Sequence, residues 1–404
     1  MKKVVIIVDG FNAGRFFPIR LKQRGYDSLH LSSINMRNKQ YNKSLYIDHI
    51  IEQLNVKDTL RLLKGIYQVQ AVVAGSESGV ILAHTIAREL NLPRNNDQLA
   101  HAARDKFAMQ QVLKMNNVPY TSSLKSDKLD SILLWVNNHN KYPVVVKPVD
   151  SGGSDNVYIC HDQKQVDMAY HQIKANKTIY GSNSTEVLVQ EYLSGSEYVV
   201  NLVSCAGNHF LVEVRKYHKQ FFNGKHIYDY EELLDFNGDM QNALVNYAKK
   251  VANAIGIAYG PSHIEIIMTD DGPKLVEIAA RISGATNMEV SNETLGYNVI
   301  DLTIDSYLDK IVCLNNKRLK SEMILDVATN KQGKIISIPL KNNLSKFESI
   351  KSAHFKLEIG DTITPTVSLP TSPVKFHLVN VNREKLLQEV ETLKQDARHG
   401  FVVA

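Results

Sequence analysis

One short stretch, HIEIIMTDDGPKLVEIAAR, places two glutamates and an arginine around a turn. The run before the turn alternates polar and apolar residues and predicts a strand, and KLVEIAA after it predicts a second strand. With a three-residue loop at 270–272, Glu265 faces Glu277 across this hairpin. Two carboxylates opposed across a sheet lie about 5 Å apart and repel each other, and a hard divalent cation relieves that repulsion. The hairpin therefore predicts a magnesium site, and Arg281 predicts a second anion-binding group beside it, which together fit a magnesium-bound polyphosphate.

The same hairpin has a purely structural interpretation. Exposed hairpins carry glutamates freely, and a slip of one residue in the pairing would send one of the two carboxylates to the other face of the sheet. The hairpin alone does not decide between the two interpretations, so the other motifs of the chain have to.

A second group of residues has the composition of a phosphate site. Lys147 follows a run of three valines and precedes Pro148 and a loop of small residues: Ser151, Gly152, Gly153 and Ser154. Glycines let the backbone N–H groups approach an anion closely, and the serines add donors. The motif GxxxxGK[ST] is absent, so this is not a P-loop. The alternative is an ordinary hairpin loop beside a lysine whose charged end reaches solvent.

A third segment could line a purine. Glu191, Tyr192 and Leu193 follow the predicted strand VLVQ, and Glu197 comes six residues after Glu191. Backbone groups at 191–193 could bind the base, and a carboxylate could bind the ribose hydroxyls. The alternative is that these charged residues beside a turn are simply solvated.

The composition limits the class of protein. The chain has 404 residues, enough for two or three domains, with 44% hydrophobic and 22% charged residues, as in soluble globular proteins. A formal net charge of +5 without basic clusters argues against nucleic-acid binding, and no apolar run approaches the roughly 18 residues of a membrane span.

The apolar run at the N-terminus stops at Asp9, too early for a signal peptide. The three cysteines form no disulfide or zinc pattern, so we expect a cytoplasmic protein.

Strand and helix signals alternate over residues 1–95, which predicts a parallel α/β domain. Asp105 predicts a helix cap, and 142–160 predicts a strand, a loop and a second strand. Residues 216–239 are predicted to form a long polar connection. Its aromatic and basic stretch, 217–236, could bind a substrate or lie at the surface.

The order of these motifs resembles the ATP-grasp superfamily over about the whole chain. The ending EIAARISG is similar to that of carboxylate–amine ligases that join unprotected L-amino acids into dipeptides. The resemblance implies an ATP-grasp fold of the α/β class with four parts: a parallel α/β domain at 1–95, ATP-grasp subdomains at 96–185 and 186–311 that clamp ATP, and a small α+β subdomain at 312–404.

The resemblance also implies roles for individual residues. Lys106 and Lys147 would hold the ATP phosphates under the Ser151–Ser154 loop, and the Glu191, Tyr192 and Leu193 segment would bind adenine, with Glu197 on the ribose. Glu265 and Glu277 would bind one or two Mg²⁺ ions, for which Mn²⁺ could substitute. Arg281 with Ser283 and Gly284 would stabilise an acyl phosphate and a tetrahedral intermediate. Many ATP-grasp enzymes have asparagine where this chain has Ala279, so a further metal ligand has to come from Asp229, Glu231 or Asn287.

The implied reaction is ATP-dependent amide formation through an acyl phosphate, releasing ADP and phosphate. The expected partners are small molecules rather than nucleic acid or membrane, and a homodimer is the expected assembly because dimers are the commonest state of soluble oligomers. The alternatives are another ATP-grasp ligase or carboxylase and, from a different class, a non-catalytic ATP-binding sensor.

Overall fold

The N-terminal part of the chain forms a four-stranded parallel sheet with the order β3-β2-β1-β4, as the alternation of strands and helices predicted. The computed structural model describes residues 2–63, 65–149, 151–153, 155–178, 183–223, 225–308, 314 and 316–404. The strands are β1 (Lys2–Val8), β2 (Asp27–Ser32), β3 (Asp48–Ile51) and β4 (Tyr67–Ala74), and the helices are α1 (Phe17–Gln23), α2 (Val56–Leu63) and α3 (Val80–Glu89). The apolar run of β1 is fully buried, because helices cover a parallel sheet.

A small antiparallel sheet follows, with the order β5-β8-β6-β7. Helices α5 and α6 pack against it and against each other. Because β8 lies in this sheet, the sheet extends beyond residue 185, where the sequence placed the end of the first ATP-grasp subdomain. Its elements are β5 (Ser123–Ser126), α5 (Leu129–His139), β6 (Val144–Pro148), β7 (Tyr158–Cys160), α6 (Gln163–Ala175) and β8 (Val187–Glu191).

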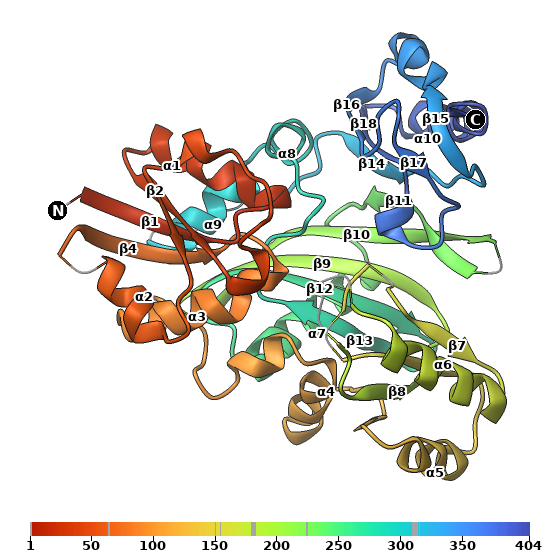
Figure 1. The fold of residues 1–404 in the computed structure, drawn as a ribbon, viewed down its shortest axis with the longest axis horizontal. Coiled ribbons are helices and arrows are strands. Elements are labelled where there is room, and N and C mark those ends of the chain that lie inside the picture. Colours follow the sequence, from red (N-terminus) through yellow and green to blue (C-terminus); the bar gives the residue numbers. More distant parts are fainter. Residues whose placement is uncertain are drawn as a thin grey trace.

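An eight-stranded sheet crosses the middle of the molecule with the order β13-β12-β9-β10-β11-β14-β18-β16 (Figure 1). Helix α7 packs against β9, β10, β12 and β13, and α4 packs against α7 and β13. These elements are α4 (Lys106–Met115), β9 (Ser196–Cys205), β10 (Asn208–Phe222), β11 (Lys225–Leu233), α7 (Asp239–Ile255), β12 (Gly260–Thr269), β13 (Gly272–Ala279), α8 (Met288–Leu295) and α9 (Val299–Tyr307).

The expected long connection at 216–239 is wrong, because most of it is the antiparallel hairpin of β10 and β11. A strand is recognised in a sequence by apolar residues on one of its two faces. In this hairpin the tyrosines, lysines and glutamates of one face line a polar cavity and the other face is also partly polar, so the alternation was hidden.

The C-terminal part extends the same sheet rather than forming a separate one, because β11 pairs with β14. It has its own apolar core between the sheet and α10, in which Leu325, Phe376, Leu386 and Val390 are fully buried. Figure 1 shows this part (blue) and the N-terminal domain (red and orange) at opposite ends of the molecule. Its elements are β14 (Ser321–Asp326), β15 (Gly333–Ser337), β16 (Ile350–Phe355), β17 (Thr362–Ile363), β18 (Val374–Asn380), α10 (Arg383–Ala397) and β19 (Val402–Val403). Of the helices in the described ranges, none has the length and apolar character needed to cross a membrane.

Candidate active site

A cavity of about 390 Å³ lies between the small sheet and one face of the central sheet. Every site residue predicted from the sequence that the structure describes lines it, and Ser154 lies outside the described residues. The lining residues are, from the predicted set, Lys106, Lys147, Ser151, Gly152, Gly153, Glu191, Tyr192, Leu193, Glu197, Glu265, Glu277, Arg281, Ser283 and Gly284. Segments up to 178 residues apart in the sequence therefore meet at one place, although their individual roles stay predictions.

The hairpin of β12 and β13 opposes Glu265 to Glu277, which confirms the predicted pairing. The predicted three-residue loop is wrong: Thr269 pairs with Gly272, so the turn contains only two residues. The register then shifts at Val276, which has no partner of its own, and this bulge restores the facing of the two glutamates.

The two opposed carboxylates differ strongly in their protonation. Burial, and then the charges of Glu277 and Glu197, raise the pKa of Glu265 well above its ordinary value. Burial acts the same way on Glu277, but the ammonium of Lys106 and the guanidinium of Arg281 outweigh it and lower the pKa of Glu277 to about 2. One member of the pair is therefore a stabilised anion, and the other is a carboxyl group that ionises fully only when more positive charge is present.

His263 is the nearest partner of Glu265, with Nε2 at 3.4 Å from its carboxyl oxygen. Its Nδ1 lies 2.8 Å from the Asn201 amide oxygen, and Asn201 in turn donates to Glu213 at 2.6 Å. The amide oxygen can only accept, so the proton of the ring sits on Nδ1 and Nε2 faces Glu265 as an acceptor. Burial, and then Arg281, lower the pKa of His263 to about 4, so the ring is neutral near pH 7.

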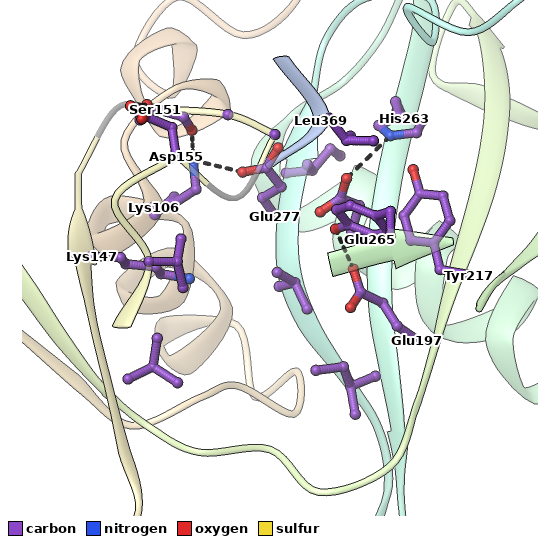
Figure 2. A pocket seen from close by; sticks show the side chains of 18 of the residues that line it. Lys106, Lys147, Ser151, Asp155, Glu197, Tyr217, His263, Glu265, Glu277 and Leu369 are labelled. Atoms are coloured by element: carbon purple, nitrogen blue, oxygen red, sulfur yellow. Dashed lines mark hydrogen bonds and ion pairs between the residues drawn. The ribbon is translucent and has the colours of Figure 1, made fainter. Parts of the chain in front are cut away.

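Two lysines approach the carboxylate pair from the opposite wall. Lys106, the first residue of α4, donates to the Ser151 carbonyl oxygen and to Glu277, each at 2.6 Å (Figure 2). Lys147, at the end of β6, is only 6% exposed. Burial and the neighbouring Lys106 lower the pKa of Lys147 to about 8. An anion with several oxygens would satisfy both ammonium groups, as in a phosphate site.

The segment after β8 lies at another part of the cavity wall. The carboxylate of Glu191 accepts hydrogen bonds from the Ser122 N–H and from Lys274, each at 3.1 Å, so it already binds neighbouring protein groups. Glu197 accepts from Tyr228 at 3.0 Å and pairs with Lys219 at 2.5 Å. The predicted base contact at 191–193 is therefore left chiefly to backbone groups, since the Glu191 side chain already has two donors.

Arg281 belongs to an ion-pair chain that the sequence did not reveal. Its Nε donates to Glu77 at 2.7 Å, and Arg104 pairs with the other oxygen of Glu77 at 2.6 Å. Glu77 comes from the loop after β4, so the N-terminal domain contributes this carboxylate to the cavity. The sequence signal was a glycine-containing loop at the carboxyl end of a parallel strand, where ligand-binding residues gather.

Several other lining residues were not predicted individually, although the stretch 217–236 was expected either to bind a substrate or to lie at the surface. Tyr217, Lys219 and Tyr228 come from the β10–β11 hairpin, and Leu369 and Lys375 come from the C-terminal part. The tyrosine rings of 217 and 228 meet edge to face with centroids 4.8 Å apart. The alternation of Tyr217 and Lys219 could have identified a strand, whereas no local signal marks Leu369 or Lys375.

Only one of the three residues considered as a further metal ligand points to the cavity. Asp229 pairs with Lys394 at 2.6 Å, and Asn287 caps α8, accepting from Glu289 N–H at 3.0 Å. Glu231 lines the cavity and is 8% exposed. Burial raises its pKa, while Lys375 and Arg215 oppose that change.

The residues fit a magnesium ion bound together with phosphates. In the part of the chain that the structure describes, no group of three or more His, Cys, Asp or Glu side chains is arranged as a metal cage. Mg²⁺ usually takes one or two protein carboxylates and completes its shell with water and phosphate oxygens. The opposed pair of Glu265 and Glu277, with its raised pKa on one member, has the donor set and the charge that such an ion requires.

Comparisons with known proteins agree with this geometry. Residues 140–289 match the family described as ATP-grasp domain. The chain is 29% identical to dapdiamide A synthase of Enterobacter agglomerans, over 97% of this chain and 95% of that protein. It is 23% identical to an L-arginine-specific L-amino acid ligase of Bacillus subtilis, over 64% of each protein. Its fold is similar to that of an L-amino acid ligase from Bacillus licheniformis, with a TM-score of 0.81, 16% identity and coverage of 100% and 99% of the two chains. The predicted fold is thereby confirmed.

Proposed function

We propose that the chain is an ATP-dependent carboxylate–amine ligase that joins two L-amino acids, and the match of residues 140–289 to the ATP-grasp domain family supports the use of ATP. The observation that carries the proposal is the meeting of Glu265 and Glu277 with Lys106, Lys147 and Arg281 in one cavity. The similarity to a protein named L-arginine-specific L-amino acid ligase supports the choice of amino acids as substrates, and the similarity to dapdiamide A synthase extends over nearly the whole chain.

In this proposal the nucleotide lies along the cavity wall from the 191–197 segment to the lysines. The backbone at Glu191–Leu193 takes the adenine, and Glu197, fixed by Tyr228 and Lys219, takes the ribose hydroxyls. Lys106 and Lys147 hold the phosphates beneath Gly152 and Gly153. Glu265 and Glu277 would hold Mg²⁺, or Mn²⁺ in its place, which supplies positive charge to the phosphate oxygens.

The reaction takes place in two steps. A carboxylate oxygen of the first substrate attacks the γ-phosphorus of ATP, the bond to the β-phosphate oxygen breaks, and ADP leaves an acyl phosphate. The neutral amine nitrogen of the second substrate then attacks the acyl carbon, the C–O bond to phosphate breaks, phosphate leaves, and the nitrogen loses a proton to solvent. Arg281, oriented by Glu77 and flanked by Ser283 and Gly284, is placed to stabilise the negative charge on the reacting oxygens.

Glu231 offers a partner for the ammonium group of an amino acid. It is buried at the cavity wall, and among the described residues its carboxylate makes no hydrogen bond or ion pair. Three further carboxylates lie near it, Glu213 and Glu322 paired with Arg215 and Asp326 paired with Lys375. Arg215 and Lys375 offset only part of that negative charge. This end of the cavity therefore favours a cation.

Incubation of the pure protein with ATP, Mg²⁺ and pooled L-amino acids tests the proposal. The expected products are ADP, phosphate and a compound with the mass of two amino acids minus water. ADP with a product of any other composition would indicate another ATP-grasp ligase or a carboxylase, and tight ATP binding without turnover would indicate an ATP sensor. Either result would overturn the proposal.

Arg281→Ala should lower kcat by about two orders of magnitude or more, as loss of a charge-stabilising donor does. Arg281→Lys should recover little, because a lysine cannot keep both the contact to Glu77 and the forked geometry of a guanidinium. Steady-state ADP release measures both variants. A near-normal kcat in Arg281→Ala would contradict the assigned role.

A further inference from the structure

The C-terminal part of the chain reaches the cavity through one short turn, Leu369–Thr371 (η7), and through Lys375 on β18. Leu369 is the apolar side chain that this part contributes to the cavity lining. In the view of Figure 2, Leu369 lies toward the same end of the cavity as His263, whereas Lys147 and Glu197 lie toward the other end. Leu369 thus faces the reactive end rather than the part of the wall formed by 191–197.

The turn that presents Leu369 is held by its own hydrogen bonds. The hydroxyl oxygen of Thr371 accepts from the N–H groups of Val367 and Ser368, at 2.8 and 3.0 Å. Lys356 donates to the Leu369 carbonyl oxygen at 2.7 Å. These bonds fix the backbone of the turn, so the Leu369 side chain starts from a defined position and can serve as part of the cavity wall.

The same turn touches the glycine loop that is expected over the phosphates. A methyl group built on Gly153 would lie 3.5 Å from Pro370 Cδ and 3.8 Å from Leu369 Cβ. The turn therefore lies against the glycine loop, and under the proposed function this is the end of the cavity at which the substrate carboxylate would meet the γ-phosphate. An apolar side chain at that end is available to the side chain of a substrate, since the nucleotide base is expected elsewhere.

We propose that Leu369 is a specificity-determining residue that limits the size of the amino-acid side chain accepted beside the γ-phosphate. The inference rests on the proposed ligase function and adds to it a wall supplied by the C-terminal part of the chain. An apolar wall discriminates by volume, and one methylene group more or less in such a pocket changes the specificity about 10- to 200-fold.

The test compares Leu369→Ala and Leu369→Phe with the wild-type protein over a series of L-amino acids from alanine to phenylalanine. The measured quantities are kcat/KM for each amino acid at saturating ATP, and KM for ATP. The quantity compared is the ratio of kcat/KM for large amino acids to kcat/KM for small ones. Leu369→Ala should raise this ratio by about tenfold or more, and Leu369→Phe should lower it. KM for ATP should change less than about twofold in both variants.

Val367→Ala is the matched control, because Val367 lies on the same segment, is 39% exposed and does not line the cavity. Its ratio of kcat/KM values should equal that of the wild type. Thermal unfolding of all three variants shows whether they are folded. A uniform loss of activity for every amino acid, or equal preferences in the two Leu369 variants, would overturn the inference while leaving the ligase function intact. Absence of any amino-acid ligation by the wild-type protein would overturn the proposed function first and this inference with it.

Discussion

The two opposed glutamates of the hairpin have identical side chains but different protonation states, because their surroundings differ. Lys106 and Arg281 stabilise the anion of Glu277, while Glu265 receives mainly burial and negative neighbours. Without added positive charge, ionised Glu265 is costly, and the neutral carboxyl can donate to His263 Nε2 instead. The pair is therefore suited to a cation that arrives with the nucleotide.

Glu265→Gln should change the stability of the protein and its ATP turnover in opposite directions. We expect the metal-free variant to be more stable than the wild type by about 1 kcal/mol or more, because the raised pKa of Glu265 makes its carboxyl take up a proton on folding, which an amide does not need to do. We also expect ATP turnover to fall by about two orders of magnitude or more, because a ligand of the metal is lost. Thermal unfolding and ADP release measure the two effects, with the exposed Glu358→Gln as control. An unchanged dependence of turnover on Mg²⁺ would contradict the assignment.

Lys147 should give ATP binding a pH dependence. Its pKa is about 8 in the nucleotide-free protein, because burial and Lys106 disfavour its charged form. Below this pH the ammonium is present and KM for ATP should be constant. Above it the charge is lost, and KM should rise by up to about tenfold per pH unit. In Lys147→Arg the side chain stays charged, so the rise should be absent. Parallel pH profiles for the two proteins would argue against this role of Lys147.

At the scale of single elements, the register of the β12–β13 hairpin and the start of α4 set the geometry of the site. The bulge at Val276 compensates for a turn of two residues and returns Glu277 to the face of Glu265. Asp105 caps α4 by accepting from the N–H groups of Phe107 and Ala108 at 2.8 and 2.9 Å. Lys106 is the first residue after that cap, so the position of its ammonium depends on an ordered first turn.

Asp105→Ala should cost about 1 kcal/mol of stability through loss of the cap and should also raise KM for ATP. The matched control is Asn382→Ala, which removes the equivalent cap of α10, with hydrogen bonds of 2.9 and 3.2 Å, and Asn382 does not line the cavity. It should cost a similar amount of stability without changing KM. Chemical denaturation and ATP kinetics test both. Equal KM values in the two variants would show that the start of α4 does not position Lys106.

At the scale of the whole molecule, the eight-stranded sheet joins the cavity wall to the C-terminal part. A buried ion pair connects the two parts: Arg215 on β10 pairs with Glu322 on β14 at 2.7 Å, and also with Glu213 on its own strand at 2.8 Å. Burial opposes ionisation of Glu322, but Arg215 and His377 lower its pKa to about 2. Removing the guanidinium would leave two buried carboxylates uncompensated.

Arg215→Met should therefore destabilise the protein by about 3–5 kcal/mol at pH 7. Arg61→Met, which breaks an exposed pair with Asp58, should cost less than about 1 kcal/mol. The folded-state pKa of Glu322 is depressed, so its ion pair contributes fully above its ordinary pKa of 4.5 and is lost as the pH falls toward 2. The difference between wild type and Arg215→Met should shrink over that pH range in urea denaturation. A difference independent of pH would point to packing rather than charge.

The predictions from sequence were strongest where neighbouring residues carry the signal. The parallel sheet at the N-terminus, the cap of α4 and the facing of Glu265 and Glu277 were confirmed, and the ATP-grasp fold was recognised from the order of the motifs. The hairpin at 208–233 was missed, because a strand that lines a polar cavity lacks the apolar face by which strands are recognised. The roles of the individual site residues, the domain boundaries and the homodimer stay predictions.

The sequence by itself determined which functional groups are available: two carboxylates on one hairpin, two lysines, a glycine loop and an arginine. Alternation, capping and turn residues act over a few positions, so they are visible in the order of the residues. Only the tertiary structure decided which distant groups complete the site. Glu77 arrives from the first sheet, Glu231 from a hairpin read as a connection, and Leu369 and Lys375 from the last part of the chain. Their positions follow from the packing of sheets against one another, and that packing is a property of the whole fold rather than of any local stretch.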